Sequence, residues 1–196
     1  MGLGALRRFR LAYDVSELFR RYFINTLFDS TFVVLGIVSA TVVTAGPPIG
    51  VTLGAMAAAC IAIGISSGVS VFEAERLEAE IRMQKIERAM LSELRDTHID
   101  RTLRTYRLLV SLVNFSAPLL VFAITSLPFL LYLVFGVPSL IQASEISIFV
   151  AVAMVFTAGF FLGRVAGRHP LRQGLRMTIA ALATFILLVL LQTYLV

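Results

Sequence analysis

The sequence predicts an all-α integral membrane protein with five transmembrane helices and a cytoplasmic helical hairpin between the second and the third. First, 58% of the 196 residues are hydrophobic, only 15% are charged, and the mean hydropathy is +0.89. A soluble domain is about half apolar and about a quarter charged, so the apolar excess here must face lipid. Second, five apolar runs reach the roughly 20 residues that cross a bilayer. Third, the basic residues fall into three groups that five crossings bring to one side.

This composition also excludes several classes of protein. An ordinary cytosolic enzyme, a disordered chain and a nucleic-acid-binding domain are all excluded, although the pI is near 10.0 and the net charge is +5. In a membrane protein, a basic balance indicates topology before it indicates partners, so we expect the lipid bilayer and no nucleic acid as a partner.

The predicted spans cover residues 26–45, 51–72, 108–135, 146–165 and 177–196. An uncharged turn from Gly46 to Gly50 joins the first two. Pro118 and Pro128 predict that the third span is kinked or ends early. The chain then divides into residues 1–72 (a cytoplasmic amphipathic N-terminal helix and two spans), 73–107 (a cytoplasmic Glu-rich hairpin) and 108–196 (the last three spans).

The polar segments also carry helix signals. Asp14, with Glu17 three residues later, predicts the cap of a short amphipathic helix to Phe23 that lies at the membrane interface. Neither Gly nor Pro occurs from residue 69 to residue 95, so the second span is predicted to continue into the cytosol as one helix to about Arg95. The run 97–100 predicts the cap of another short helix that leads into the third span.

The basic residues set the predicted orientation. Five precede the first span, eight lie between the second and third, and four surround the turn between the fourth and fifth, which together are all 17 Lys and Arg residues. The positive-inside rule makes that side cytoplasmic, with the N-terminus inside and the C-terminus outside. A short chain without targeting signals fits a prokaryotic plasma membrane.

One acidic residue, Asp29, lies within an apolar run. Asn25, Asp29, Phe32 and Gly36 share one helix side. A carboxylate inside a membrane costs several kcal/mol unless it is paired, hydrated or bound to a cation, and such acids usually mark ion paths. We therefore interpret Asp29 as an ion ligand. The alternative is that it reaches the interface or pairs with an arginine of the hairpin.

The hairpin carries a second candidate site. Glu73, Glu80 and Glu87 recur every seven residues, with Met83 and Met90 on a neighbouring stripe, whereas Glu75 and Glu78 lie on another side. Carboxylate oxygens together with thioether sulfur suit Fe(II) or Mn(II). Spacing alone favours the alternative, in which Arg76–Glu80 and Glu78–Arg82 pair on a solvated helix and the methionines pack.

Other features predict packing rather than chemistry. The small-residue rows Gly46–Gly50–Gly54 and Gly159–Gly163–Gly167 allow helices to approach closely. Cys60 is interpreted as a small residue facing lipid or another helix. No phosphate-binding loop and no nucleophile–base set occurs in the sequence, so neither enzymatic activity nor a resident cofactor is predicted.

Two segments resemble a known family. Residues 28–38 (FDSTFVVLGIV) resemble the first-span signature of the vacuolar iron transporter family, whose members export Fe(II) and Mn(II). Residues 67–76 (SGVSVFEAER) resemble the point where that family's second span leaves the membrane as a Glu-bearing helix, and residues 89–91 are also similar. The layout of five spans agrees along the chain, as in a short prokaryotic-type member with a reduced cytoplasmic domain.

The resemblance implies a homodimer whose first spans face each other across a metal path. It places Asp29 at the transport site, and Glu73, Glu75, Glu78 and Glu80 match the family's metal-collecting glutamates in place and type. Ile63 stands near the position of the family's membrane-embedded methionine, and Met56 and Cys60 are the nearest soft side chains.

We therefore expect a transporter that exports divalent transition metal, Fe²⁺ or Mn²⁺, from the cytosol, with proton antiport as the coupling hypothesis. The metal is cargo, and no resident cofactor is expected. The alternative is a membrane scaffold that transports nothing and whose charged hairpin docks a soluble partner.

Overall fold

The structure is a computed structural model that describes residues 3–44, 48–90, 98–136 and 139–195, with side chains described for 21–44, 48–85, 87–88, 105–136 and 139–194. These residues form five helices, α1 (Leu3–Val43), α2 (Ile49–Met90), α3 (His98–Phe135), α4 (Leu140–Val165) and α5 (Pro170–Leu195). All five are long and apolar enough to cross a membrane. The predicted all-α, multi-pass membrane class is therefore confirmed.

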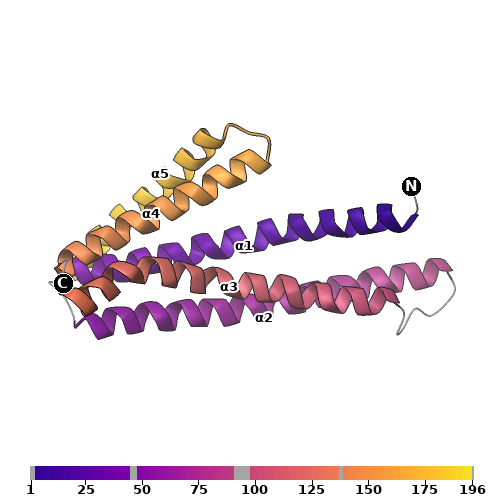
Figure 1. Cartoon of the computed structure of the whole chain (residues 1–196), viewed down its shortest axis with the longest axis horizontal. Coiled ribbons are helices and arrows are strands. Elements are labelled where there is room, and N and C mark those ends of the chain that lie inside the picture. Colours follow the sequence, from indigo (N-terminus) through magenta and orange to yellow (C-terminus); the bar gives the residue numbers. More distant parts are fainter. Residues whose placement is uncertain (1–2, 45–47, 91–97, 137–138, 196) are drawn as a thin grey trace.

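Helix α1 is the centre of the arrangement. It contacts each of the other four helices, whereas α2 packs mainly on α3, and α4 mainly on α5. Figure 1 shows α1, α2 and α3 running side by side, while the α4–α5 pair leans away from them toward its own connecting turn. The N-terminus and the α2–α3 connection lie at one end of the molecule, and the C-terminus lies at the other.

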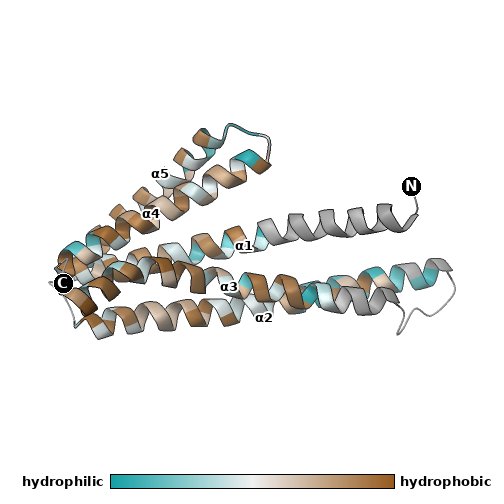
Figure 2. Cartoon of the chain, viewed as in Figure 1, coloured by the Kyte–Doolittle hydropathy of each residue, from teal (hydrophilic) through white to brown (hydrophobic). Residues whose placement is uncertain are grey.

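Helices α2 and α3 extend well beyond their apolar parts. At 1.5 Å per residue, the 42 residues of α2 measure about 63 Å, roughly twice the hydrocarbon thickness of a bilayer. Figure 2 shows the apolar residues along most of α2 and the polar ones near its C-terminal end. The predicted continuity of the helix beyond the second apolar run is confirmed as far as Met90. Its predicted end at Arg95 and the predicted cap at Thr97 lie outside the described residues.

Several predicted boundaries are wrong. Helix α1 is continuous from Leu3, so Asp14 lies inside it and caps no separate helix. No proline interrupts residues 3–43, and so nothing ends the helix between its polar and apolar parts. Helix α3 also continues through Pro118 and Pro128 to Phe135, which contradicts an early end.

Helices α4 and α5 each begin six or seven residues earlier than hydropathy predicted. Ser139 and Gln142 form a capping box, in which the Ser139 hydroxyl accepts from the Gln142 amide at 3.4 Å and the Gln142 side chain accepts from the Ser139 amide at 3.0 Å. Helix α5 starts at Pro170, a residue whose fixed φ suits the first helical position. One consequence is that Glu145 lies inside α4, where it is exposed.

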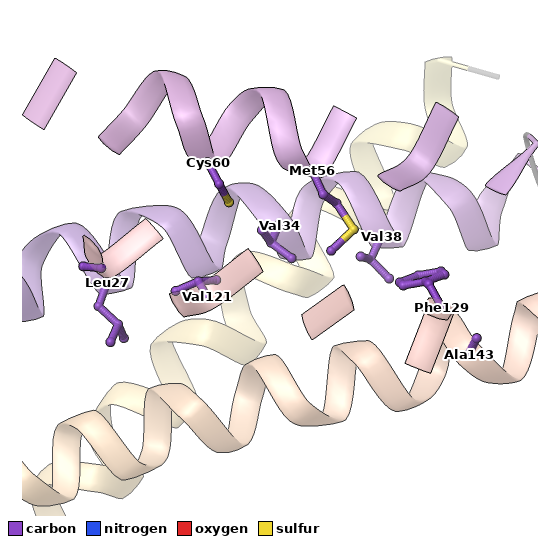
Figure 3. Packing of buried hydrophobic residues seen from close by; sticks show 9 residues of the cluster. Leu27, Val34, Val38, Met56, Cys60, Val121, Phe129 and Ala143 are labelled. Atoms are coloured by element: carbon purple, nitrogen blue, oxygen red, sulfur yellow. The ribbon is translucent and has the colours of Figure 1, made fainter. Parts of the chain in front are cut away.

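The apolar core lies where α1 meets α2, α3 and α4. Figure 3 shows Val34 and Val38 of α1 beside Met56 and Cys60 of α2, with Phe129 of α3 at one end of the cluster. Met56 and Cys60 are both 0% exposed. Cys60 is therefore a helix-facing residue, one of the two placements that the sequence left open.

Hydrogen bonds between helices complement this packing. The Thr26 hydroxyl donates to the Asn114 amide oxygen at 2.8 Å, joining α1 to α3, and both side chains are buried. On another side of α1, the Gln192 amide of α5 donates to the Gly36 carbonyl oxygen at 3.0 Å. Because lipid removes the hydrophobic drive between helices, polar contacts and close packing hold them together.

The two glycine rows differ. A Cβ at Gly163 would lie 2.8 Å from the Cβ of Gln173 and 2.9 Å from the Cα of Pro170, and one at Gly159 would lie 3.1 Å from the Cα of Gly174. These two glycines pack α4 against α5, as predicted. Gly50 and Gly54 have no neighbouring atom within 4 Å of such a Cβ, so their predicted role in packing within the chain is wrong. Gly46 lies outside the described residues.

Candidate functional site

Asp29 is exposed on the surface of the apolar part of α1. Within the described side chains, the apolar stretch of this helix is Arg21–Val43, and Asp29 lies inside it. The Asn25 amide donates to the Asp29 carboxylate at 3.2 Å, which confirms that these two residues share a side.

The surroundings of Asp29 are otherwise apolar. Val33, one turn further along, is exposed, and Phe32 and Gly36 are half-buried beside it. This surface strip, which we call the Asp29 face (Asn25, Asp29, Phe32, Val33 and Gly36), lies between the contacts of α1 with α2 and with α5. Among the described side chains, salt bridges involve only Arg76 and Arg82, so the predicted alternative of an arginine partner for Asp29 is not observed there.

The soft side chains of α2 lie on a different side of α1. Met56 and Cys60 pack against Val34 and Val38, and at about 100° per residue Val34 is about 140° around the helix from Asp29. Neither sulfur can therefore join Asp29 in the same chain. The Asp29 face offers one carboxylate and one amide, which are both hard oxygen donors.

The glutamates of α2 are largely paired with arginines of the same helix. The Arg76 guanidinium lies 3.1 Å from the Glu80 carboxylate and 3.9 Å from that of Glu73, and Arg82 lies 3.8 Å from Glu78. Both i, i+4 pairs predicted from spacing are confirmed. All of these side chains are more than half exposed, so the pairs contribute little stability and can open at low cost.

Glu75 differs from its neighbours because it connects two helices. It is half-buried and accepts a hydrogen bond of 3.2 Å from the Tyr22 hydroxyl of α1. The sequence grouped Glu75 with the metal-collecting glutamates and placed Tyr22 at the membrane interface, so it missed this contact between α1 and α2. Glu75 thus links α2 to α1 at Tyr22.

Met83, Glu87 and Met90 are the remaining predicted metal ligands. Met83 and Glu87 are half-buried on α2, and the Met90 side chain lies outside the described part. Among the described side chains, no three His, Cys, Asp or Glu residues gather closely enough to hold a metal ion. A single chain therefore brings Asp29 and Asn25 together. The glutamates of α2 are instead spread along their helix.

Sequence reasoning also missed two polar features of the spans. Asn114 is 1% exposed and its amide nitrogen has no hydrogen-bond partner, although its oxygen accepts from Thr26. An asparagine in an apolar run, four residues before Pro118, was the only signal for it. Glu145 is an acid inside α4, and it was missed because the fourth span was predicted to begin one residue after it.

Comparisons with known families, with curated proteins and with solved structures find no match to this chain. The resemblance to the vacuolar iron transporter family thus stays a prediction carried by residues 28–38, 67–76 and 89–91.

Proposed function

We propose that this protein exports divalent transition metal, Fe²⁺ or Mn²⁺, from the cytosol, as a member of the vacuolar iron transporter family. The observation that carries the proposal is Asp29, an exposed carboxylate in the apolar part of α1 that accepts a hydrogen bond from Asn25. Such a group is unstable against lipid, and a bound cation or a proton removes its cost. The metal is the cargo, and the proposal includes no enzymatic step and no resident cofactor.

The partner that completes the site is a second copy of the chain. Asp29 and Asn25 supply two oxygen donors, whereas hard divalent cations take about six, some of them from water. A two-fold axis beside the Asp29 face would double the protein oxygens to four, because both copies present the same surface. It would also remove Asp29 from lipid. We propose a homodimer built on the membrane-spanning part of α1.

Cross-linking tests this dimer. In a Cys60→Ser background, Val33→Cys is expected to give a covalent dimer with a short bismaleimide in membranes, because Val33 lies on the Asp29 face and is 40% exposed. Leu182→Cys is the matched control, since it is 44% exposed on α5, outside that face. Equal cross-linking at the two positions, or none at Val33, would contradict an interface at the Asp29 face.

The proposed orientation has the N-terminus in the cytosol and the C-terminus outside, with a prokaryotic plasma membrane as the host. The arginine distribution supports it through the positive-inside rule. The polar end of α2 is then cytosolic. There Glu73, Glu80 and Glu87 would raise the local concentration of cations, and Met83 and Met90 would offer softer contacts.

Flux into proteoliposomes tests transport itself. Wild-type protein is expected to move Mn²⁺ and Fe²⁺ faster than protein-free liposomes do, and an opposing proton gradient is expected to accelerate the movement. Flux that ignores the proton gradient would remove antiport from the proposal but leave transport. Folded protein that moves neither metal, with or without the gradient, would overturn the transporter.

A scaffold is the second candidate, and the ion pairs of α2 favour it. Glu78 and Glu80 both engage arginines of their own helix, as expected of a solvated surface that docks another protein. In that case Asp29 would be dispensable, and the glutamates would bind a polypeptide rather than a metal ion. Transport assays on Asp29 variants separate the two candidates.

A further inference from the structure

An apolar groove lies where the α4–α5 pair leans away from the rest of the molecule. Its volume is about 640 Å³, and its walls come from α1, α3 and α4. Figure 1 shows α4 separating from α1 and α3 in this region. The lining residues include Leu27, Leu120, Ile124, Phe149 and Phe161, and Thr157 is the one among them with a polar side chain.

A second hollow of about 420 Å³ continues the groove toward the α4–α5 turn. Ile24, Leu162 and Val165 line both hollows, so the two are contiguous. The second hollow is more polar than the first, because Arg21 and Asn25 join its wall. The combined space is thus apolar along its length and basic at one end.

Positive charge is concentrated at that end. Arg21 lines the hollow, while Arg164 and Arg168 do not line it but flank its residues Val165 and Ala166 in the chain; all three arginines are exposed. The salt bridges of the described side chains are confined to Arg76 and Arg82, so no carboxylate neutralises these three arginines there. The exposed arginines make this end of the space attractive to an anion.

The apolar groove lies away from Asp29, although its basic continuation borders the Asp29 face at Asn25. Leu27 lines the groove, and at about 100° per residue it lies about 160° around α1 from Asp29. A second copy on the Asp29 face would leave the groove open to lipid. The second hollow, by contrast, shares Asn25 with the Asp29 face, so a headgroup there would lie next to the proposed metal site.

We propose that the space holds one anionic phospholipid. An acyl chain fills the apolar groove, and the phosphate group lies at the basic end, near Arg21, Arg164 and Arg168. Basic pockets between transmembrane helices at the cytoplasmic side are known to bind lipid headgroups in this way. The lipid would fill the space that the leaning α4–α5 pair leaves beside α1 and α3.

The lack of tryptophan in the chain makes a direct test possible. Phe149→Trp places a single fluorophore in the groove, and Leu187→Trp places one on α5 as the control. The two lie at matched depth, because Phe149 is 16 residues before the end of α4 at Val165 and Leu187 is 17 residues after the start of α5 at Pro170. Residues 149 and 187 are 74% and 63% exposed. Each variant is reconstituted in phosphatidylcholine containing increasing amounts of brominated phosphatidylglycerol, which quenches tryptophan on contact.

The groove tryptophan is expected to reach half-maximal quenching at a several-fold lower fraction of brominated phosphatidylglycerol than the control tryptophan. Adding Arg21→Gln should weaken that preference about fivefold, the effect of one basic residue near the surface, whereas Arg82→Gln should leave it unchanged. If the quenching of both tryptophans follows the overall fraction of brominated phosphatidylglycerol in the bilayer, the proposed lipid site is overturned. Equal preference for brominated phosphatidylcholine would overturn its selectivity for anionic lipid.

Discussion

Replacing Asp29 with asparagine is expected to reduce Mn²⁺ flux by more than about 100-fold, because loss of even an outer-shell partner of a metal ligand costs 10–100-fold. The change keeps the size of the side chain and its capacity to bond with Asn25, and it removes the charge that binds the ion. The measurement is initial-rate Mn²⁺ uptake into proteoliposomes with equal amounts of folded wild-type and variant protein.

Glu145→Gln is the matched control for this experiment. Glu145 is also an exposed acid within a membrane-spanning helix, but it lies on α4 near its N-terminal end. We expect the Glu145 variant to keep most of its flux. If both variants lose flux equally, the loss reflects a general need for negative charge, and if Asp29→Asn transports normally, Asp29 is not on the path.

The second large effect is expected at Gly163. A methyl group there would lie 2.8 Å from the Cβ of Gln173 and 2.9 Å from the Cα of Pro170, and neither atom belongs to a flexible chain end. Overpacking of this kind costs about 1–3 kcal/mol, so Gly163→Ala should lower the free energy of unfolding and the melting temperature in detergent. Larger residues at this position should force α4 and α5 apart.

Gly54→Ala provides the control for helix propensity. Gly54 lies in α2, is exposed, and has no neighbouring atom within 4 Å of the position that a Cβ would take. Alanine there should leave stability unchanged or raise it by up to about 1 kcal/mol. Equal destabilisation at both glycines would contradict the close packing of α4 on α5.

Hydropathy was sufficient to predict the fold class and the number of helices, because five apolar runs long enough to cross a bilayer leave few alternatives. Hydropathy predicted the residues at which helices begin less well. The polar residues Ser139 and Gln142 look like a loop in the sequence, yet as a capping box they begin α4. The N-terminal polar segment looked like a separate helix because hydropathy changes near residue 23, although nothing in the backbone breaks there.

The candidate site was predictable where it depends on neighbours along one helix. The Asn25–Asp29 bond and the two ion pairs of α2 follow from i, i+4 spacing. Contacts between helices were not predictable in the same way. The Tyr22–Glu75 bond and the burial of Met56 away from Asp29 depend on how α1 and α2 are rotated against each other, which one sequence does not encode locally.

The oxygen-only character of the Asp29 face has a consequence for the cargo. Without Met56 or Cys60 beside Asp29, the site has no soft ligand from its own chain, and a hard-to-borderline ion such as Mn²⁺ fits it better than Cu⁺ does. Fe²⁺ remains compatible with oxygen ligands.

Mn²⁺ binding at equilibrium tests whether Asp29 binds the transported ion between two chains. Wild-type protein and the Asp29→Asn variant are compared in the same lipid, so that binding by the glutamates of α2 is common to both. We expect the wild-type protein to bind one more Mn²⁺ per pair of chains than the variant binds. Identical binding by the two proteins would contradict a metal site at Asp29.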